Sequence, residues 1–275
     1  MAPRPPNSAT QRPERSPVSD ATSAPRAAGE MSLTQHLVEL RGRLFKALIA
    51  LTIGTVAGYA VFPQVLDFLI QPYCGALVDI RPGEGCTLIA LRPLEPFSVR
   101  IRTSLVIGLF VGGPVIFYQL WRFITPGLTT KERRYALPFV TLSQIMFGFG
   151  LAFAYLIIPQ GLRILLSLGG PGIEALLSAD EYLSFYLAMS VAFGIVFELP
   201  LVLIFLALAG VVNASGLRKA RPFAIVLIFI AAAFITPTVD AVTLLLVAGP
   251  MVLFYELSIG AAWLIQRSRR RRATS

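Results

Sequence analysis

Long apolar runs, separated by short polar clusters, dominate the pattern of this 275-residue chain. Several runs reach the roughly 18 to 25 residues that a helix needs to cross about 30 Å of hydrocarbon. The alternating pattern of a membrane β-barrel is absent, so the spans must be helices that satisfy their own backbone hydrogen bonds. The pattern predicts an all-α polytopic membrane protein with six transmembrane helices, at about residues 44–62, 103–120, 135–159, 182–212, 222–235 and 242–265.

The composition supports this reading and excludes an ordinary soluble domain. Hydrophobic residues make up 55% of the chain and charged residues only 14%, and the mean hydropathy is +0.71. The net charge of +9 would suit a nucleic-acid-binding protein, but the basic residues lie between the apolar runs and not along one face. We therefore expect no nucleic acid partner.

The distribution of the basic residues predicts the orientation. Six spans place both termini on one side of the membrane. If that side is the cytoplasm, 19 of the 24 Lys and Arg residues lie there, as the positive-inside rule requires. We therefore predict an N-in, C-in arrangement, with external loops at about residues 63–102 and 160–181.

The predicted spans divide the chain into three regions. Residues 1–30 contain six Pro and four Arg and show no apolar period, which predicts a disordered cytoplasmic tail. Residues 31–266 form the six-helix membrane domain, and residues 267–275 form a basic cytoplasmic tail. Arg-rich tails of this kind bind anionic lipid, at about 1 kcal/mol for each basic residue near the surface.

Few residues suit a metal or a covalent reaction. Cys74 and Cys86 share the first external loop, where they either form a disulfide or remain two free thiols; two cysteines are too few for a structural zinc site. His36 is the only histidine, and the chain has no phosphate-binding P-loop motif. We expect no metal, no cofactor and no enzymatic activity.

Four acidic residues stand out by their surroundings. Glu198 lies near the middle of the fourth span, beside Pro200, which we expect to kink the helix. Glu256 lies in the last span, where pairing with a basic residue is the simpler explanation. Glu39 and Glu132 lie within basic clusters at the feet of the first and third spans, where an intramolecular ion pair is the ordinary explanation and recognition of a basic ligand is the alternative.

Seven short motifs stand out along the chain. They are His36-Leu37-Val38-Glu39-Leu40-Arg41-Gly42-Arg43-Leu44, Leu94-Glu95-Pro96-Phe97, Trp121-Arg122-Phe123-Ile124-Thr125-Pro126-Gly127-Leu128 continuing to Lys131-Glu132-Arg133-Arg134-Tyr135, Glu181-Tyr182-Leu183-Ser184-Phe185, Phe197-Glu198-Leu199-Pro200, Leu217-Arg218-Lys219 and Thr236-Pro237. In this order they resemble the motifs of the TatC family, the polytopic receptor subunits of the twin-arginine (Tat) protein translocase. The resemblance covers about residues 31–266.

The resemblance implies a receptor that binds the twin-arginine signal peptides of folded cargo at the cytoplasmic face. It implies export driven by the proton motive force, a bent, glove-like helix bundle and a location in the bacterial inner membrane. Two guanidinium groups match carboxylates in a bidentate geometry, which agrees with the family's use of the acids at the positions of Glu132 and Glu39. The implied peptide-binding surface also includes Phe123, Lys131 and Arg133, with Phe123 either packing on the peptide or anchoring at the interface.

The resemblance further implies partners and an intramembrane polar site. The partners are single-span TatA and TatB-type subunits and further copies of the chain in a homo-oligomeric receptor complex. Glu198 matches the family's intramembrane acid, which faces a cavity. At the last external turn this chain reads Thr236-Pro237-Thr238-Val239-Asp240, with one proline lost and the acid displaced by one residue. The partner contact that Thr236, Pro237 and Asp240 would make therefore rests on a shifted motif.

Two other classes remain as alternatives. A proton-coupled secondary transporter of a small solute would use Glu198 as its midplane site, but the chain shows no inverted repeat. An intramembrane enzyme would need a nucleophile with a base, and no histidine accompanies Ser184 or Ser190.

Overall fold

The computed structural model describes residues 33–80, 86–124, 136–167, 178–236 and 241–273. Residues 39–275 form one compact unit, and residues 1–38 form a second, of which only residues 33–38 are described. The described residues contain no strand beyond one isolated bridge between Ile89 and Ser178. They form eight helices, α1 (Leu33–Ala60), α2 (Phe62–Ile80), α3 (Glu95–Ile124), α4 (Ala136–Ser167), α5 (Ala179–Phe197), α6 (Leu199–Leu208), α7 (Ala214–Ile235) and α8 (Ala241–Ala273). The predicted all-α fold is confirmed.

Five stretches of helix are long and apolar enough to cross a membrane. They lie in α1, α3, α4, the combined α5 and α6, and α8, and they correspond to five of the six predicted spans. The sixth prediction, residues 222–235, lies in α7, whose first half carries Arg218, Lys219 and Arg221. The 14 residues of α7 after Arg221 carry no charge and rise about 21 Å as a helix, less than the roughly 30 Å of hydrocarbon, so α7 is not among the helices that are long and apolar enough to cross a membrane.

Glycines allow α1 and α3 to touch along their backbones. A Cβ atom on Gly54 would lie 2.6 Å from the carbonyl oxygen of Gly108, and one on Gly112 would lie 2.9 Å from that of Ala50. No side chain fits at such distances, so the small residues are required for this approach. Gly108 and Gly112 therefore form the face of α3 that packs on α1.

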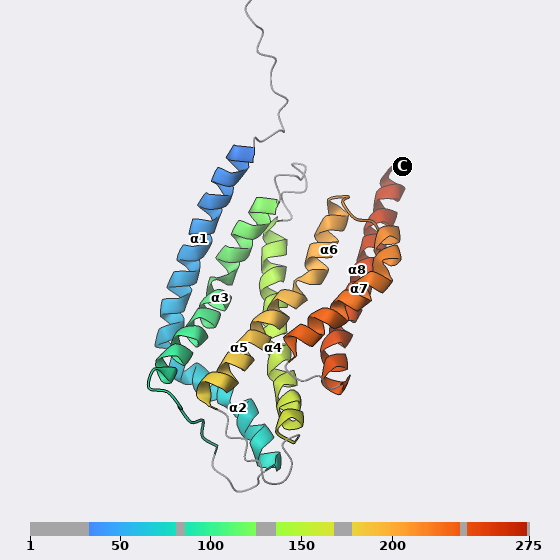
Figure 1. The fold of residues 1–275 in the computed structure, drawn as a ribbon. Coiled ribbons are helices and arrows are strands. Elements are labelled where there is room, and N and C mark those ends of the chain that lie inside the picture. The colour runs from blue at the N-terminus through green and yellow to red at the C-terminus, as the bar shows by residue number, and fades with distance from the viewer. Residues whose placement is uncertain (1–32, 81–85, 125–135, 168–177, 237–240, 274–275) are drawn as a thin grey trace, which may run out of the picture. The chain divides into compact units, whose positions relative to one another are not determined.

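The fourth predicted span is two helices. α5 ends at Phe197 and α6 begins at Leu199, with Glu198 between them (Figure 1). Pro200 has no N–H and its ring would clash with the preceding turn, so the helical hydrogen-bond pattern is interrupted there. The N–H of Glu198 donates to the carbonyl oxygens of Ile195 and Val196. The predicted kink at Pro200 is confirmed.

The first external loop, expected as a long connection over residues 63–102, contains a helix that the sequence analysis missed. α2 occupies its first half, with Pro72 inside the helix, and packs against α4. Its buried residues Leu69, Tyr73 and Leu77 recur every four positions, which is a helical period. The helix nevertheless does not stand out in the sequence as a membrane span. The loop is therefore largely ordered structure.

A disulfide joins Cys74 in α2 to Cys86 in the extended segment before α3, with the two Cα atoms 5.4 Å apart. Replacing both cysteines by serine should lower the free energy of unfolding by about 3 kcal/mol, because a cross-link over a 12-residue separation restricts the unfolded chain. Thermal unfolding in detergent measures this change. Reductant should destabilise the wild type and leave the double serine variant unaffected; equal melting temperatures for both proteins, with and without reductant, would contradict the prediction.

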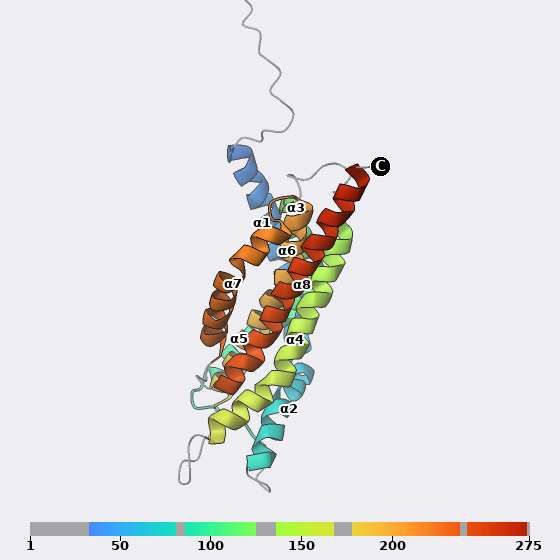
Figure 2. The ribbon, with the colours of Figure 1, turned by 90° about the vertical axis from the view of Figure 1, so that its right-hand side faces the viewer.

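At the other end of the chain, α8 packs against α6 and α7 (Figure 2). Glu256 of α8 forms an ion pair with Arg221 of α7, with the two charged atoms 2.6 Å apart. The pairing expected for Glu256 is confirmed. α8 runs on to Ala273, so the basic residues from Arg267 onward continue the helix; the Arg267 guanidinium lies 5.2 Å from the centre of the Trp263 ring.

Candidate functional site

The ends of several helices gather at one end of the bundle formed by residues 39–275. In Figure 1 the Glu39 end of α1, the last turn of α3 and the first turn of α4 lie at this end, as do the end of α6 and the C-terminal end of α8. The sequence-predicted peptide-binding residues belong to these segments. Glu39 and Phe123 are described, whereas Lys131, Glu132 and Arg133 lie outside the described residues, in the connection between α3 and α4.

Glu39 forms an ion pair within its own helix. Arg43, one turn later in α1, donates to Glu39 Oε1 from Nε at 3.0 Å and from Nη2. The side chains are 27% exposed for Glu39 and 14% for Arg43, so this pair is partly shielded from solvent. The carboxylate is therefore preoriented on a helix face and carries an intramolecular partner.

The end of α3 is anchored by a buried tryptophan. Trp121 donates from its indole Nε1 to Ser143 Oγ of α4 at 2.8 Å. Its ring packs against Phe139 of α4 and Phe205 of α6, with ring centres 4.8 and 4.9 Å away. Because Trp121 is only 2% exposed, it belongs to the interior of the bundle and is no interfacial anchor. Phe123, two residues later, is half-buried and lies at the helix end that Trp121 holds in place.

Glu198 lies next to this aromatic cluster. Ser143, whose hydroxyl accepts from Trp121, is also a close neighbour of the Glu198 carboxyl group. The second carboxyl oxygen, Oε1, is buried and has no hydrogen-bond partner among the described residues. An acid held at a helix break inside an apolar bundle is costly, so Glu198 stays the predicted intramembrane polar site. Ser143 thus connects Glu198 to the end of α3.

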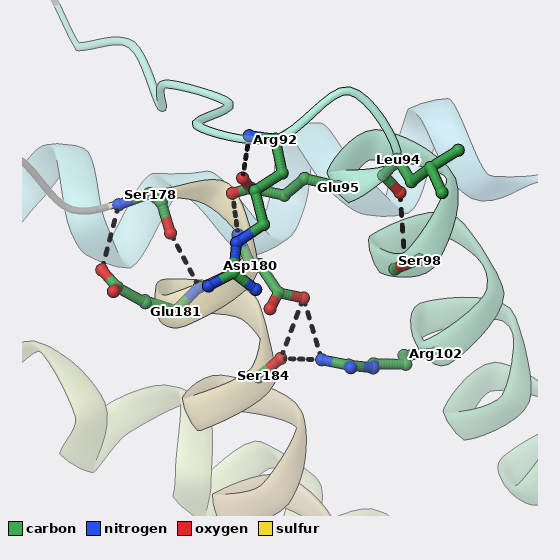
Figure 3. Close-up of polar contacts among 9 residues, drawn as sticks. All are labelled: Arg92, Leu94, Glu95, Ser98, Arg102, Ser178, Asp180, Glu181 and Ser184. Atoms are coloured by element: carbon green, nitrogen blue, oxygen red, sulfur yellow. Dashed lines mark hydrogen bonds and ion pairs between the residues drawn. The ribbon is translucent and has the colours of Figure 1, made fainter.

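At the opposite end of the bundle, Glu95 organises a polar cluster for which the sequence analysis assigned no role. Its Oε2 atom accepts from the backbone N–H group of Leu91 at 2.8 Å. Figure 3 shows the other two bonds, from the backbone N–H of Arg92 to Oε2 at 3.1 Å and from that of Asp180 to Oε1 at 2.8 Å. Glu95 is the first residue of α3 and is 5% exposed. An acid at a helix N-terminus within a matching motif was the signal that could have identified it.

The start of α5 completes this cluster. Ser178 and Glu181 form a reciprocal capping box at the N-terminus of α5. Arg102 of α3 bonds both Asp180 and Ser184, at 2.8 and 2.6 Å. Figure 3 shows these contacts beside those of Glu95, so α3, α5 and the segment before α3 are tied together at this end.

The remaining candidates lie on α7 and beyond. Thr236 closes α7: its hydroxyl and its backbone N–H both donate to the carbonyl oxygen of Ala232, each at 2.9 Å, and it is 5% exposed. Pro237 and Asp240 lie outside the described residues. Within the described ranges, no group of three His, Cys, Asp or Glu residues could hold a metal ion.

Comparisons with known proteins match this architecture. The family model described as Sec-independent protein translocase protein (TatC) matches residues 35–250. The TatC protein of Frankia casuarinae is 41% identical over 248 residues, which cover 88% of this chain and 68% of that relative. The TatC protein of Aquifex aeolicus is 40% identical over 243 residues, which cover 87% of this chain and 98% of that relative.

Solved structures agree. Two crystal structures of the twin arginine translocase receptor TatC, one of them in DDM, superpose with TM-scores of 0.70 and 0.71 at 39% identity. They cover 84% and 82% of this chain and 99% of each solved chain. This chain therefore belongs to the TatC family, and it is a multi-pass membrane component of a Sec-independent protein translocase.

Proposed function

We propose that this chain is the receptor subunit of a twin-arginine translocase, which binds the twin-arginine signal peptides of folded cargo at the cytoplasmic face and organises their export by the proton motive force. The observation that carries the proposal is the match to the solved receptor TatC, at 39% identity over 99% of that chain. The translocase family match over residues 35–250 supports it. Every relative reported above is a translocase protein, so a solute transporter based on Glu198 has no support.

The proposed peptide-binding surface lies at the end of the bundle that holds the Glu39 end of α1 and the last turn of α3. Glu132 is the main acceptor for the two guanidinium groups, flanked by Lys131 and Arg133. Glu39 assists, since a peptide arginine must share its carboxylate with Arg43. The aromatic ring of Phe123 packs on the apolar side of the peptide, on a helix end that Trp121 fixes.

The proposed complex contains single-span TatA and TatB-type subunits and further copies of this chain. The short apolar part of α7 supports such contacts, because Phe223 and Phe234 are 79% and 88% exposed. The partner contact extends to Thr236, Pro237 and Asp240. Glu198 is the proposed intramembrane polar site of the receptor, and anionic lipid binds the basic termini.

The proposed location is the bacterial inner membrane, with both termini in the cytoplasm. A fluorescent protein that matures only in the cytoplasm, fused after Ser275, should fluoresce, whereas a periplasmic phosphatase fused there should be inactive. The physical reason is the excess of basic residues on that side, 19 of 24. The disulfide at the other end of the bundle supports this orientation, since disulfides persist in oxidising compartments. An active phosphatase fusion with a dark fluorescent fusion would reverse the orientation.

A further inference from the structure

An apolar cavity of about 490 Å³ lies between α2, α3, α4 and α5. Carbon atoms make up nearly all of its wall. Its lining includes Val65 and Phe68 of α2, Val106 and Phe110 of α3, Leu156 of α4 and Leu187 of α5. Phe68, Phe110 and Leu156 are also exposed at the molecular surface, so the cavity opens to the outside of the bundle.

The helix packing explains why a space remains there. α3 and α4 are joined where Gln144 Nε2 donates to the carbonyl oxygen of Phe110 at 3.0 Å, and again at Trp121 and Ser143. Towards α2 the two helices separate (Figure 1), while α5 packs against both. The cavity occupies the wedge between the separating helices.

The cavity does not suit water. The Ser190 hydroxyl on its wall donates to the carbonyl oxygen of Tyr186 at 2.8 Å, so this group is already satisfied. The Thr103 hydroxyl on the wall has no hydrogen-bond partner among the described residues, but one polar atom is too few to hold a water molecule, which needs roughly two to four partners. Apolar cavities of about 150 Å³ stay dry and bind apolar molecules such as benzene. A dry space three times that size would forfeit many dispersion contacts. In a membrane, the molecule at hand to fill it is lipid.

The volume also discriminates between apolar occupants. A helix about 10 Å across occupies roughly 400 Å³ for each turn of about 5.4 Å. The cavity would therefore accept about one turn of a partner's transmembrane helix and exclude the rest. An acyl chain is much thinner and can lie along the wedge over most of its length.

A cation lies one helical turn from the cavity, on the same stripe of α3. Arg100 precedes the wall residue Thr103 by three positions, and its guanidinium stacks 3.8 Å from the centre of the Tyr59 ring. It also lies 5.4 Å from the centre of the Phe62 ring, one turn before Val65 on α2. One hydrogen bond from this group is seen, from Nη2 to the carbonyl oxygen of Tyr59 at 3.1 Å, and its Nε has no partner in the described part of the chain. Nε is buried, but no hydrogen bond from Nη1 is seen in the described part of the chain, so the outer end of the guanidinium can still pair with an anion.

We propose that the wedge between α3 and α4 binds one acyl chain of an anionic phospholipid, whose phosphate pairs with Arg100. The bound chain fills the space that the separating helices leave and holds α2 against α3 and α4. This site is distinct from surface attraction of lipid to the basic termini, because it takes a single chain in a defined place.

The test uses the purified full-length chain in detergent with phosphatidylglycerol that carries a photoreactive acyl chain. Peptide mapping should place the crosslinks on α2 near Phe68 and on α4 near Leu156. Ala152→Phe, which fills the cavity from an exposed position on α4, should lower the crosslinking at least tenfold. The control Ala233→Phe, exposed on α7 away from the cavity, should leave it unchanged.

Three further measurements keep the proposal testable if Ala152→Phe folds poorly. Ala152→Leu should lower the crosslinking severalfold. Native mass spectrometry of the wild type should show one phospholipid retained through delipidation. Arg100→Gln should abolish the preference for phosphatidylglycerol over phosphatidylcholine while the apolar crosslinks remain.

Three outcomes would overturn the proposal. The first is crosslinking spread evenly over all lipid-facing helices and insensitive to both position-152 variants, which indicates only a general lipid shell. The second is complete loss of lipid from the wild type on mild delipidation. The third is loss of the lipid crosslinks at α2 and α4 when a purified single-span partner is added, with the partner's helix crosslinked there in place of lipid.

Discussion

Glu132→Ala should weaken binding of a purified twin-arginine signal peptide roughly 10- to 100-fold, the equivalent of one lost charge-assisted contact of about 1.5 to 3 kcal/mol. The arginine fork pairs with a carboxylate in two parallel bonds, which no neutral side chain reproduces. Glu39→Ala should have a smaller effect, because Arg43 already occupies Oε1 of Glu39. Titration of a labelled peptide against the protein in nanodiscs measures both changes.

The controls separate recognition from general damage. A peptide with a Lys-Lys pair should bind weakly to every variant, since an ammonium group lacks the planar fork. Glu256→Gln, which removes an acid already paired with Arg221, should bind the Arg-Arg peptide as the wild type does. Equal binding by wild type and Glu132→Ala would refute the assignment of Glu132 as the main acceptor.

The same preparation, in membranes that also contain the single-span subunits, distinguishes binding from export. Glu198→Gln should bind the peptide normally, because Glu198 lies within the membrane-spanning part of the chain, at the break between α5 and α6. Export of a folded cargo should slow if the carboxyl group serves a later step. Unchanged export would remove Glu198 from the functional site and leave it a structural partner of Ser143.

The second large effect concerns stability. Glu95→Ala should lower the melting temperature in detergent by roughly 5 °C or more, because it removes three hydrogen bonds to a carboxylate that tie α3, the segment before it and α5 together. The melting temperature of Glu95→Gln should lie between those of Glu95→Ala and the wild type. The amide oxygen can still accept from the N–H of Asp180, but the NH₂ group then faces the N–H donors of Leu91 and Arg92. Thermal unfolding followed by tryptophan fluorescence measures the series.

A surface change near the cluster provides the comparison for this series. Ser98→Ala removes only a hydroxyl that donates to the carbonyl oxygen of Leu94 within the same helix, so its melting temperature should stay close to that of the wild type. If Glu95→Ala were as stable as Ser98→Ala, the cluster in Figure 3 would not hold this end of the bundle together.

The sequence by itself determined the helical membrane class, the positions of the spans and the break at Pro200. These features depend on local quantities: the length of an apolar run, and a proline that lacks an N–H. The motifs around Glu39, Glu95 and Glu198 identified the family for the same reason, since each is a short continuous segment.

Only the tertiary structure decided which groups meet. The bond from Trp121 to Ser143, the three donors around Glu95 and the pairing of Arg102 with Asp180 join residues that the sequence separates by up to 85 positions. The helix α2 escaped detection because polar residues such as Asp67 and Gln71, together with Pro72, interrupt its apolar positions, and its order depends on packing and the disulfide. The lipid-sized wedge also arises from how two helices separate, and the distance between helices is a property of the packed bundle that no single segment encodes.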